Sequence, residues 1–149
     1  MSGLTAPKND FTPVKIHLKT NITIGDESDS FELVSFGRYY EKGNAVFLKY
    51  DEVQEEGTTH TIVKITDRQA LILRSGAVKM RMAFNELEEQ NGSYESQLGT
   101  LMLTTKTKNV SHTQVDSKVE GDFNLSYELN MQGSPVGDYE MSINYKEEV

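Results

Sequence analysis

Arg74 is the charged side chain whose position raises the sharpest chemical question. It lies two residues before Gly76 and forms, with Lys79 and Arg81, the one concentrated group of positive charges in the sequence. If Arg74 points into a core it needs a buried partner, because an unpaired buried charge is very costly. In a ligand site, the same guanidinium would donate charge-assisted hydrogen bonds to an anionic head group. Two roles are therefore open: a structural arginine that closes one end of the fold, and a polar anchor for a ligand.

The three histidines give no sign of a metal or catalytic site. His17, His60 and His112 fall on separate segments, without a partner at metal-ligand spacing and without an H-E-x-x-H arrangement. A Ser-His-Asp triad assembled in space stays open, but no Gly-x-Ser-x-Gly turn supports it. We expect solvent-facing histidines on strands, and we predict no catalytic residue, no metal and no cofactor.

Carboxylates gather in two acidic segments, residues 51–56 and 86–89. Neither segment has the alternating oxygen ligands and central glycine of a calcium loop. A general acid–base pair between loops at one rim is an alternative interpretation. We interpret both segments as hairpin tips exposed to water, where acidic residues also discourage edge-to-edge aggregation.

The overall charge limits the partners. Lys plus Arg is 15 and Asp plus Glu is 23, so the formal net charge at pH 7 is −8. That charge repels phosphate backbones and anionic membranes, so we expect neither nucleic acid nor a membrane as partner. The chain has no cysteine, which excludes disulfides, thiolate-bound metals and thiol catalysis. The first 13 residues lack the apolar core of a signal peptide, and we expect a cytoplasmic protein.

The elements that must position these side chains are strands. Apolar and polar residues alternate at a period of two over residues 14–24, 78–84, 123–131 and 139–145. Successive strand side chains point to opposite faces, so each stretch offers one apolar and one wet face. In the second stretch, Met80 and Met82 fall on the apolar face, while Lys79 and Arg81 fall on the wet face.

Other segments carry apolar residues on both faces. We predict further strands at 31–40, 46–50, 61–65, 71–73 and 100–110, separated by turn residues. Gly37 indicates a bulge, and 84–90 is the one stretch with room for a turn of helix. The sequence predicts a flexible tail at 1–13, then a single all-β domain at 14–149. That domain is an antiparallel meander of about eight to ten strands, closed as a barrel or a sandwich.

The segment around Arg74 resembles the signature of the YwiB-like family of small bacterial proteins. The family pattern Arg-x-Gly-x-Val-x-Met-x-Met-x-Phe, with a later Tyr and Gly-x-Leu, is matched by Arg74, Gly76, Val78, Met80, Met82, Phe84, Tyr94, Gly99 and Leu101. The resemblance covers about residues 14–145, although members often carry Thr-Pro where this chain has Ser96-Gln97. It implies a lipocalin-like (calycin) antiparallel β-barrel rather than a sandwich, and it implies no activity.

Two functions follow from a barrel of this class, which holds either side chains or one small ligand. A hollow barrel would bind a small amphipathic or anionic molecule, with polar-tipped aromatic walls and adaptable methionines. The candidate ligand-binding residues are Arg74, Tyr39, Met80, Met82, Tyr94 and Tyr127. A filled barrel would instead be a structural or regulatory partner protein that works through its outer surface. The sequence shows no recognisable catalytic constellation that would indicate an enzyme. It identifies neither a protein partner nor the oligomeric state.

Overall fold

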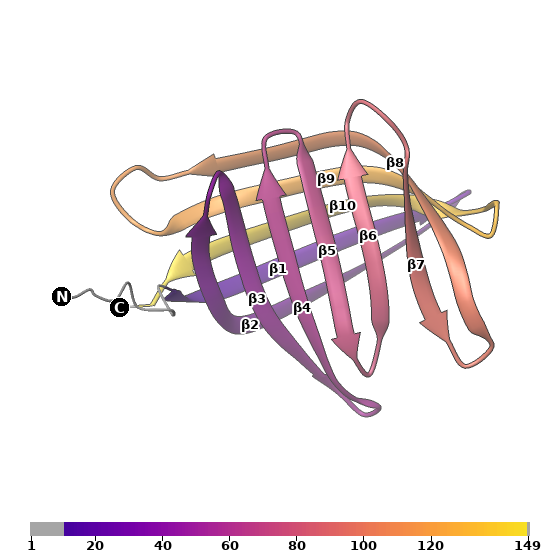
Figure 1. The fold of residues 1–149 in the computed structure, drawn as a ribbon, viewed down its shortest axis with the longest axis horizontal. Coiled ribbons are helices and arrows are strands. Elements are labelled where there is room, and N and C mark those ends of the chain that lie inside the picture. The colour runs from indigo at the N-terminus through magenta and orange to yellow at the C-terminus, as the bar shows by residue number, and fades with distance from the viewer. Residues whose placement is uncertain (1–10, 149) are drawn as a thin grey trace.

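A computed structural model describes residues 11–148, which form ten β-strands and no helix (Figure 1). The strands are β1 (Thr12–Ile24), β2 (Glu27–Lys42), β3 (Ala45–Gln54), β4 (Gly57–Thr66), β5 (Gln69–Gly76), β6 (Lys79–Asn85), β7 (Gln90–Ser96), β8 (Gly99–Gln114), β9 (Glu120–Met131) and β10 (Ser134–Glu147). Each strand pairs antiparallel with the next, and β1 also pairs with β10, so the meander closes. The predicted all-β antiparallel barrel is confirmed.

Two boundaries differ from the sequence prediction. Most of the expected tail, residues 1–10, lies outside the described residues, but Thr12 and Pro13 belong to β1 and pair with β2. Proline is tolerated there because it stands at the start of a strand. The segment 84–90 forms the end of β6, a turn and the start of β7 rather than a helix. Within the described part of the chain, no helix is long and apolar enough to cross a membrane.

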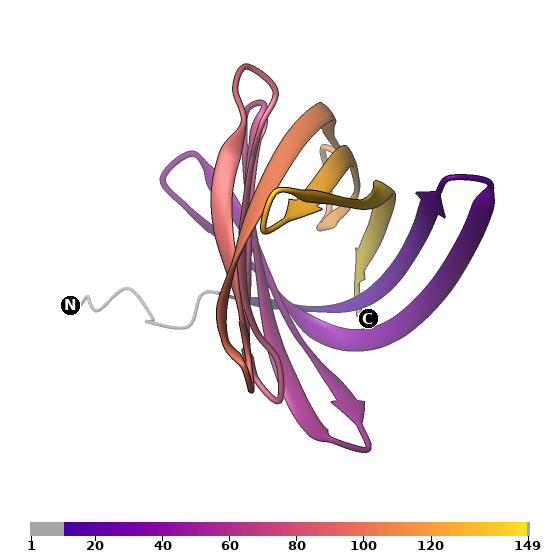
Figure 2. The same cartoon turned by 90° about the vertical axis from the view of Figure 1, so that its right-hand side faces the viewer.

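The barrel has two walls whose strands cross steeply, as Figures 1 and 2 show. Strands β3 to β7 form one wall, and β1, β9 and β10 lie across from it. The long strands β2 and β8 join the walls, because each pairs with one wall along part of its length and with the other wall further on. Side chains from both walls pack in the interior. The largest fully buried apolar ones are Tyr145, Phe84, Phe123, Ile16, Leu48, Leu103, Leu125 and Ile143.

A β-bulge in β8 changes which side chains point inward. The register between β8 and β9 shifts between Thr107 and Asn109. Thr107 is buried before the shift and Val110 after it, so the inward positions change from odd to even numbers. Bulges re-aim side chains in this way. His112 consequently turns toward the barrel interior and is half-buried, so the prediction of a solvent-facing histidine is wrong for this residue.

Gly37 allows a close approach of strands and does not mark a bulge. The register between β1 and β2 continues through Gly37 without a shift. A Cβ atom there would overlap the main-chain carbonyl oxygen of Lys49 and lie 2.8 Å from Ile16 Cδ1. Glycine is required because β2 begins to pair with β3 at Arg38, and the main chains of the two strands approach closely just before that point.

Candidate binding site in the barrel interior

A cavity of about 210 Å³ lies inside the barrel, between the two walls. Its lining comes from strands β1 to β6, β9 and β10, and the charged part from the ends of β3 and β5. Phe31 of β2 also lines the cavity and is half-exposed, so the cavity reaches the surface beside this residue.

One row of neighbouring side chains crosses the first wall at the level of Arg74. Tyr50 of β3 pairs with Thr61 of β4, Thr61 pairs with Arg74 of β5, and Arg74 pairs with Met80 of β6. Directly paired residues of an antiparallel sheet share a face. The cavity lining includes all four side chains, and the strand register is therefore what brings the guanidinium inside.

Arg74 is paired with a buried carboxylate. Its Nη2 donates to Glu52 Oε2, and the side chains are 24% and 9% exposed. Glu52 follows Tyr50 by two residues on β3, so it shares the inward face. Its expected place at a solvated hairpin tip is therefore wrong, whereas Glu55 and Glu56 at that tip are exposed. The alternation of Leu48, Tyr50 and Glu52 was the signal that could have identified the partner.

Gly76 of the family signature ends β5 just beyond Arg74. It has a φ of 97°, and a Cβ there would overlap the Thr58 carbonyl oxygen. The left-handed conformation and the close approach both require glycine. The Ala77 amide then donates to that same carbonyl at 3.0 Å. The turn into β6 is thereby fixed, and β6 brings Met80 beside Arg74.

Two threonine hydroxyls face the cavity without a hydrogen-bond partner. Within residues 11–148, the buried Oγ1 atoms of Thr20, Thr59, Thr61 and Thr107 have none. Of these, Thr20 and Thr61 line the cavity. Buried polar groups are nearly always hydrogen-bonded, because an unpaired one carries its full desolvation cost. The cavity therefore holds polar groups that the described protein atoms do not satisfy.

The rest of the cavity wall is apolar or aromatic. Met80, Met82 and Met141 contribute flexible thioethers. Tyr127 is held between Phe84, at 4.6 Å between ring centroids, and Tyr139, at 5.1 Å. Burial raises the pKa of the Tyr127 phenol, with a smaller opposing effect from Arg74. Tyr127 therefore presents a neutral phenol, which acts as a hydrogen-bonding group.

Tyr39 lies at the opposite end of the barrel, near the β2–β3 hairpin, and is not part of this cavity. Its hydroxyl donates to Glu41 Oε2 at 2.8 Å and accepts from Gln114 Nε2 at 2.9 Å, and its ring stacks on Tyr145. Its separation from Arg74 follows from the up-and-down topology, in which successive hairpins alternate between the ends. In the sequence nothing distinguishes one end from the other.

This second cluster also contains His112. Its Nε2 lies 2.8 Å from the hydroxyl of Tyr145. Burial raises the pKa of Tyr145 to about 12 and lowers the pKa of His112. Apart from the Glu41 carboxylate, the side chains of this cluster are neutral and hydrogen-bonded to one another.

The six predicted ligand-binding residues thus divide into three groups, and Tyr39, at the opposite end of the barrel, forms one of them. Arg74, Met80, Met82 and Tyr127 line one cavity. Tyr94 pairs with Met80 across β6 and β7 and packs against the core, but it is not in the cavity lining. The wet face of β6 is as predicted, because Lys79 and Arg81 are exposed.

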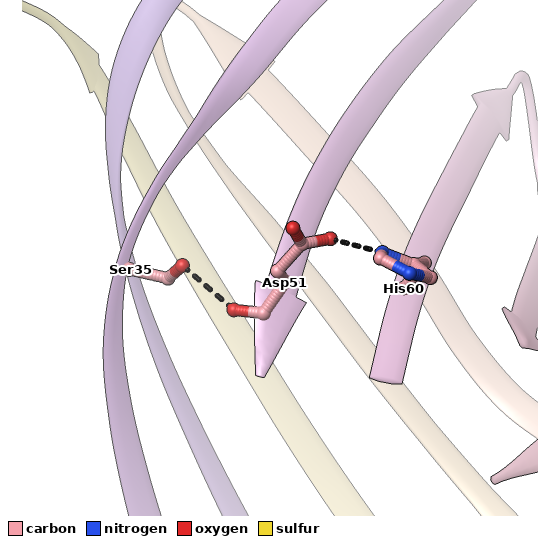
Figure 3. Close-up of polar contacts among 3 residues, drawn as sticks. All are labelled: Ser35, Asp51 and His60. Carbon is pink, nitrogen blue, oxygen red and sulfur yellow. Dashed lines mark hydrogen bonds and ion pairs between the residues drawn. The ribbon is translucent and has the colours of Figure 1, made fainter. Parts of the chain in front are cut away.

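Ser35, Asp51 and His60 lie close together in space but do not form a catalytic triad (Figure 3). His60 Nδ1 lies 2.7 Å from Asp51 Oδ1, whereas the Ser35 hydroxyl donates to the main-chain carbonyl of Asp51 at 3.0 Å. A triad requires the serine hydroxyl to bond the histidine. Among residues 11–148, no cluster of three or more His, Asp or Glu side chains is arranged to hold a metal ion.

Comparisons with known proteins agree with this architecture. A family model described as Domain of unknown function (DUF1934) matches residues 16–143. The uncharacterized beta-barrel protein YwiB of Bacillus subtilis (strain 168) is 31% identical over 135 residues, which cover 91% of this chain and 94% of that protein. The crystal structure of YwiB matches with a TM-score of 0.82 at 31% identity, over 93% of this chain and 94% of that one. The resemblance seen in the sequence is confirmed, and the chain belongs to the DUF1934 family of β-barrel proteins.

Proposed function

We propose that the barrel binds one small amphipathic molecule in its interior cavity, with the polar end at Thr20, Thr61 and Arg74. One observation carries this proposal: unpaired buried hydroxyls and an ion pair converge on a cavity whose other walls are apolar. Binding sites combine a mostly apolar lining with a few polar groups that fix the orientation of the ligand. A ligand that bonds to both hydroxyls would offset the desolvation cost that they carry.

The volume and the charge of the cavity narrow the ligand class. About 210 Å³ exceeds the roughly 150 Å³ of an engineered apolar cavity that binds benzene, so a short aliphatic chain fits. Glu52 already neutralises Arg74, which favours an uncharged polar end over an anionic head. A guanidinium has five N–H donors. Within residues 11–148, its recorded hydrogen bond is the one to Glu52, so further donors remain for a ligand oxygen.

We place this binding activity in the cytoplasm, with the cysteine-free composition as support. The proposed use of the interior is lipocalin-like, because a closed antiparallel barrel would hold a small molecule between its walls. Ten strands give a wider interior than the eight that side chains alone can fill.

Titration calorimetry with octanol, octanoate and octylamine tests the proposal. We expect octanol to bind most tightly, because the cavity has a neutral polar end. Thr61→Val removes one cavity hydroxyl at nearly constant shape. It should weaken octanol binding by about three- to tenfold, the value of one hydrogen bond. The free energy of unfolding of the free protein should stay the same or rise by about 1 kcal/mol, because an unpaired hydroxyl is lost.

Thr107→Val is the matched control. Its hydroxyl is also buried and unpaired, but it lies outside the cavity lining. This variant should gain similar stability and bind octanol as the parent does. The proposal fails if none of the three ligands binds, or if Thr61→Val and Thr107→Val have equal affinity. Either result would favour a filled barrel that works through its outer surface.

A further inference from the structure

Strands β2 and β3 separate over most of the length of β2. They pair only between residues 38–42 of β2 and 45–49 of β3. Residues 27–37 of β2 therefore pair with β1 alone, and residues 50–54 of β3 pair with β4 alone. Figures 1 and 2 show the β1–β2 and β3–β4 hairpins pointing in different directions beyond this point. We call residues 27–37 of β2 the open edge.

The hairpin turns determine which main-chain groups of the open edge point away from β1. Ile24 and Glu27 flank a two-residue turn, and in such hairpins the flanking pair exchanges both hydrogen bonds. Odd-numbered residues of β2 thus bond to β1. The N–H and C=O groups that point into the gap belong to Ser28, Ser30, Glu32, Val34 and Phe36.

Strand β3, on the other side of the gap, also directs alternate main-chain groups into the gap. Gln54 and Gly57 flank the β3–β4 turn, so even-numbered residues of β3 bond to β4. Asp51 and Val53 direct their main-chain groups into the gap. The Ser35 hydroxyl donates to the Asp51 carbonyl at 3.0 Å, which bridges the gap at its narrow end (Figure 3). Beyond Ser35, the Ser30 N–H donates to Asp29 Oδ1 of the same strand at 2.9 Å, and no hydrogen bond described within residues 11–148 joins β2 to β3.

Large apolar side chains are exposed along both sides of the gap. Phe31 is 51% exposed, Val34 53%, Phe36 64% and, on β3, Val53 81%. Proteins usually protect long edge strands from new strand pairing. A free edge with exposed apolar side chains is therefore a candidate interaction surface.

The charge around the gap is acidic. The open edge carries Glu27, Asp29 and Glu32 and no Lys or Arg, and the β3–β4 hairpin adds Asp51, Glu55 and Glu56. Glu32 contacts His17 at 2.8 Å, whereas the others on the open edge have no ion pair within residues 11–148. A second copy of this chain, with a net charge of −8, would bring its own acidic edge to this one. Charge complementarity favours a cationic partner.

We propose that the open edge binds an extended, cationic segment of another protein, which adds as a strand beside β2. Main-chain hydrogen bonds to the even-numbered residues would supply affinity, as in other strand-addition complexes. Apolar side chains of the segment would contact Val34 and Phe36 on one face of β2, and basic ones would lie near Glu27 and Asp29 on the other face. This proposal does not depend on a ligand in the cavity.

Two synthetic peptides test the inference, one alternating valine and lysine and one alternating valine and glutamate. Fluorescence anisotropy should detect binding of the lysine peptide, at least about tenfold tighter than the glutamate peptide. In the complex, amide hydrogen exchange should slow at Ser28, Ser30, Glu32, Val34 and Phe36. Ser30→Pro removes a gap-facing N–H, whose bond to the exposed Asp29 side chain an added strand would replace, without breaking a bond to β1. It should weaken binding by about tenfold. Ser30→Ala is the matched control and should bind as the parent does.

Three results would overturn the proposal. The first is equal binding of the two peptides. The second is amide exchange on β2 that the lysine peptide leaves unchanged. The third is a Ser30→Pro variant that binds the lysine peptide as tightly as Ser30→Ala does. Sedimentation velocity tests the competing occupant, which is a second copy of this chain. A dimer of the parent chain that Ser30→Pro dissociates would assign the open edge to a second copy and overturn the peptide proposal. Parent chain that stays monomeric and binds the lysine peptide supports it.

Discussion

Arg74 and Glu52 form a pair in which each charge depends on the other. The glutamate is nearly buried and the arginine is mostly so. Removing one partner of a buried pair leaves an uncompensated charge, whereas replacing both with apolar residues is often tolerated. The pair is therefore a structural element of the barrel as well as the polar end of its cavity, and a single substitution at Arg74 cannot separate these two roles.

A double-mutant cycle tests the structural role. Arg74→Met should lower the free energy of unfolding by about 3–5 kcal/mol, because Glu52 is left buried and unpaired. The double variant Arg74→Met with Glu52→Leu should recover most of that loss. Urea unfolding of the parent, both single variants and the double variant measures the coupling. Losses below about 1 kcal/mol in both single variants would mean that water, and not the partner, solvates each charge.

His112 makes stability depend on pH at the other end of the barrel. Burial lowers its pKa from the ordinary 6.5, so the folded chain disfavours the protonated form. As pH falls below about 6.5 the unfolded chain binds more protons than the folded one, and the free energy of unfolding decreases. The stabilisation is fully present above that pH and is lost toward the lowered pKa.

His112→Gln keeps a hydrogen-bonding side chain beside Tyr145 but cannot titrate. Between about pH 7.5 and about pH 5.5, its urea midpoint should fall less than that of the parent. The His60→Gln variant is the control, because it makes the same substitution at an exposed imidazole. Identical pH dependence in the parent and in His112→Gln would refute the burial of a neutral imidazole.

At the scale of elements, the close approach of β2 to β3 depends on Gly37. A methyl group there would meet a main-chain oxygen, which cannot move aside as a flexible side chain can. Gly37→Ala should destabilise the barrel by about 1–3 kcal/mol, the usual cost of overpacking. Ser30→Ala, an exposed change on the same strand, should stay within about 0.5 kcal/mol. Thermal unfolding that does not distinguish the two variants would mean that β2 shifts without cost.

The sequence predicted the strands whose alternation is clean, and for a physical reason. In β1, β6, β9 and β10 one face is buried and the other is wet, so the period of two is visible. β7 was not predicted because Gln90–Ser96 has no continuous apolar face and Tyr94 is its single strong β-former. Its place is set by its neighbours, and Gly92 permits a close approach to the Arg81 carbonyl.

The candidate site was predictable in part. The alternation predicted that Met80 and Met82 share one inward face, and both line the cavity, whereas the direction of Arg74 was left open by the sequence. Glu52 was missed because acidic neighbours masked its position in the alternation. His112 was misplaced because one extra residue in β8 reverses the inward face, and a register shift is not visible in a single sequence.

At the scale of the whole molecule, the two ends of the interior differ. At one end Tyr39, Gln114, Tyr145 and His112 are hydrogen-bonded to one another. The other holds a cavity beside a buried ion pair and reaches the surface at Phe31. Because these four side chains are hydrogen-bonded to one another and the cavity hydroxyls of Thr20 and Thr61 have no partner within residues 11–148, the second end is where we expect a ligand.

Methionine methyl NMR tests this expectation most directly, because the side chains report from known places. Met80, Met82 and Met141 line the cavity, whereas Met131 lies outside the lining and Met102 is exposed. With octanol added to protein carrying labelled methionine methyl groups, the account predicts intermolecular contacts from octanol to Met80, Met82 and Met141. It predicts none to Met102 or Met131. Octanol contacts confined to Met102, or no methyl perturbation at saturating octanol, would contradict the account.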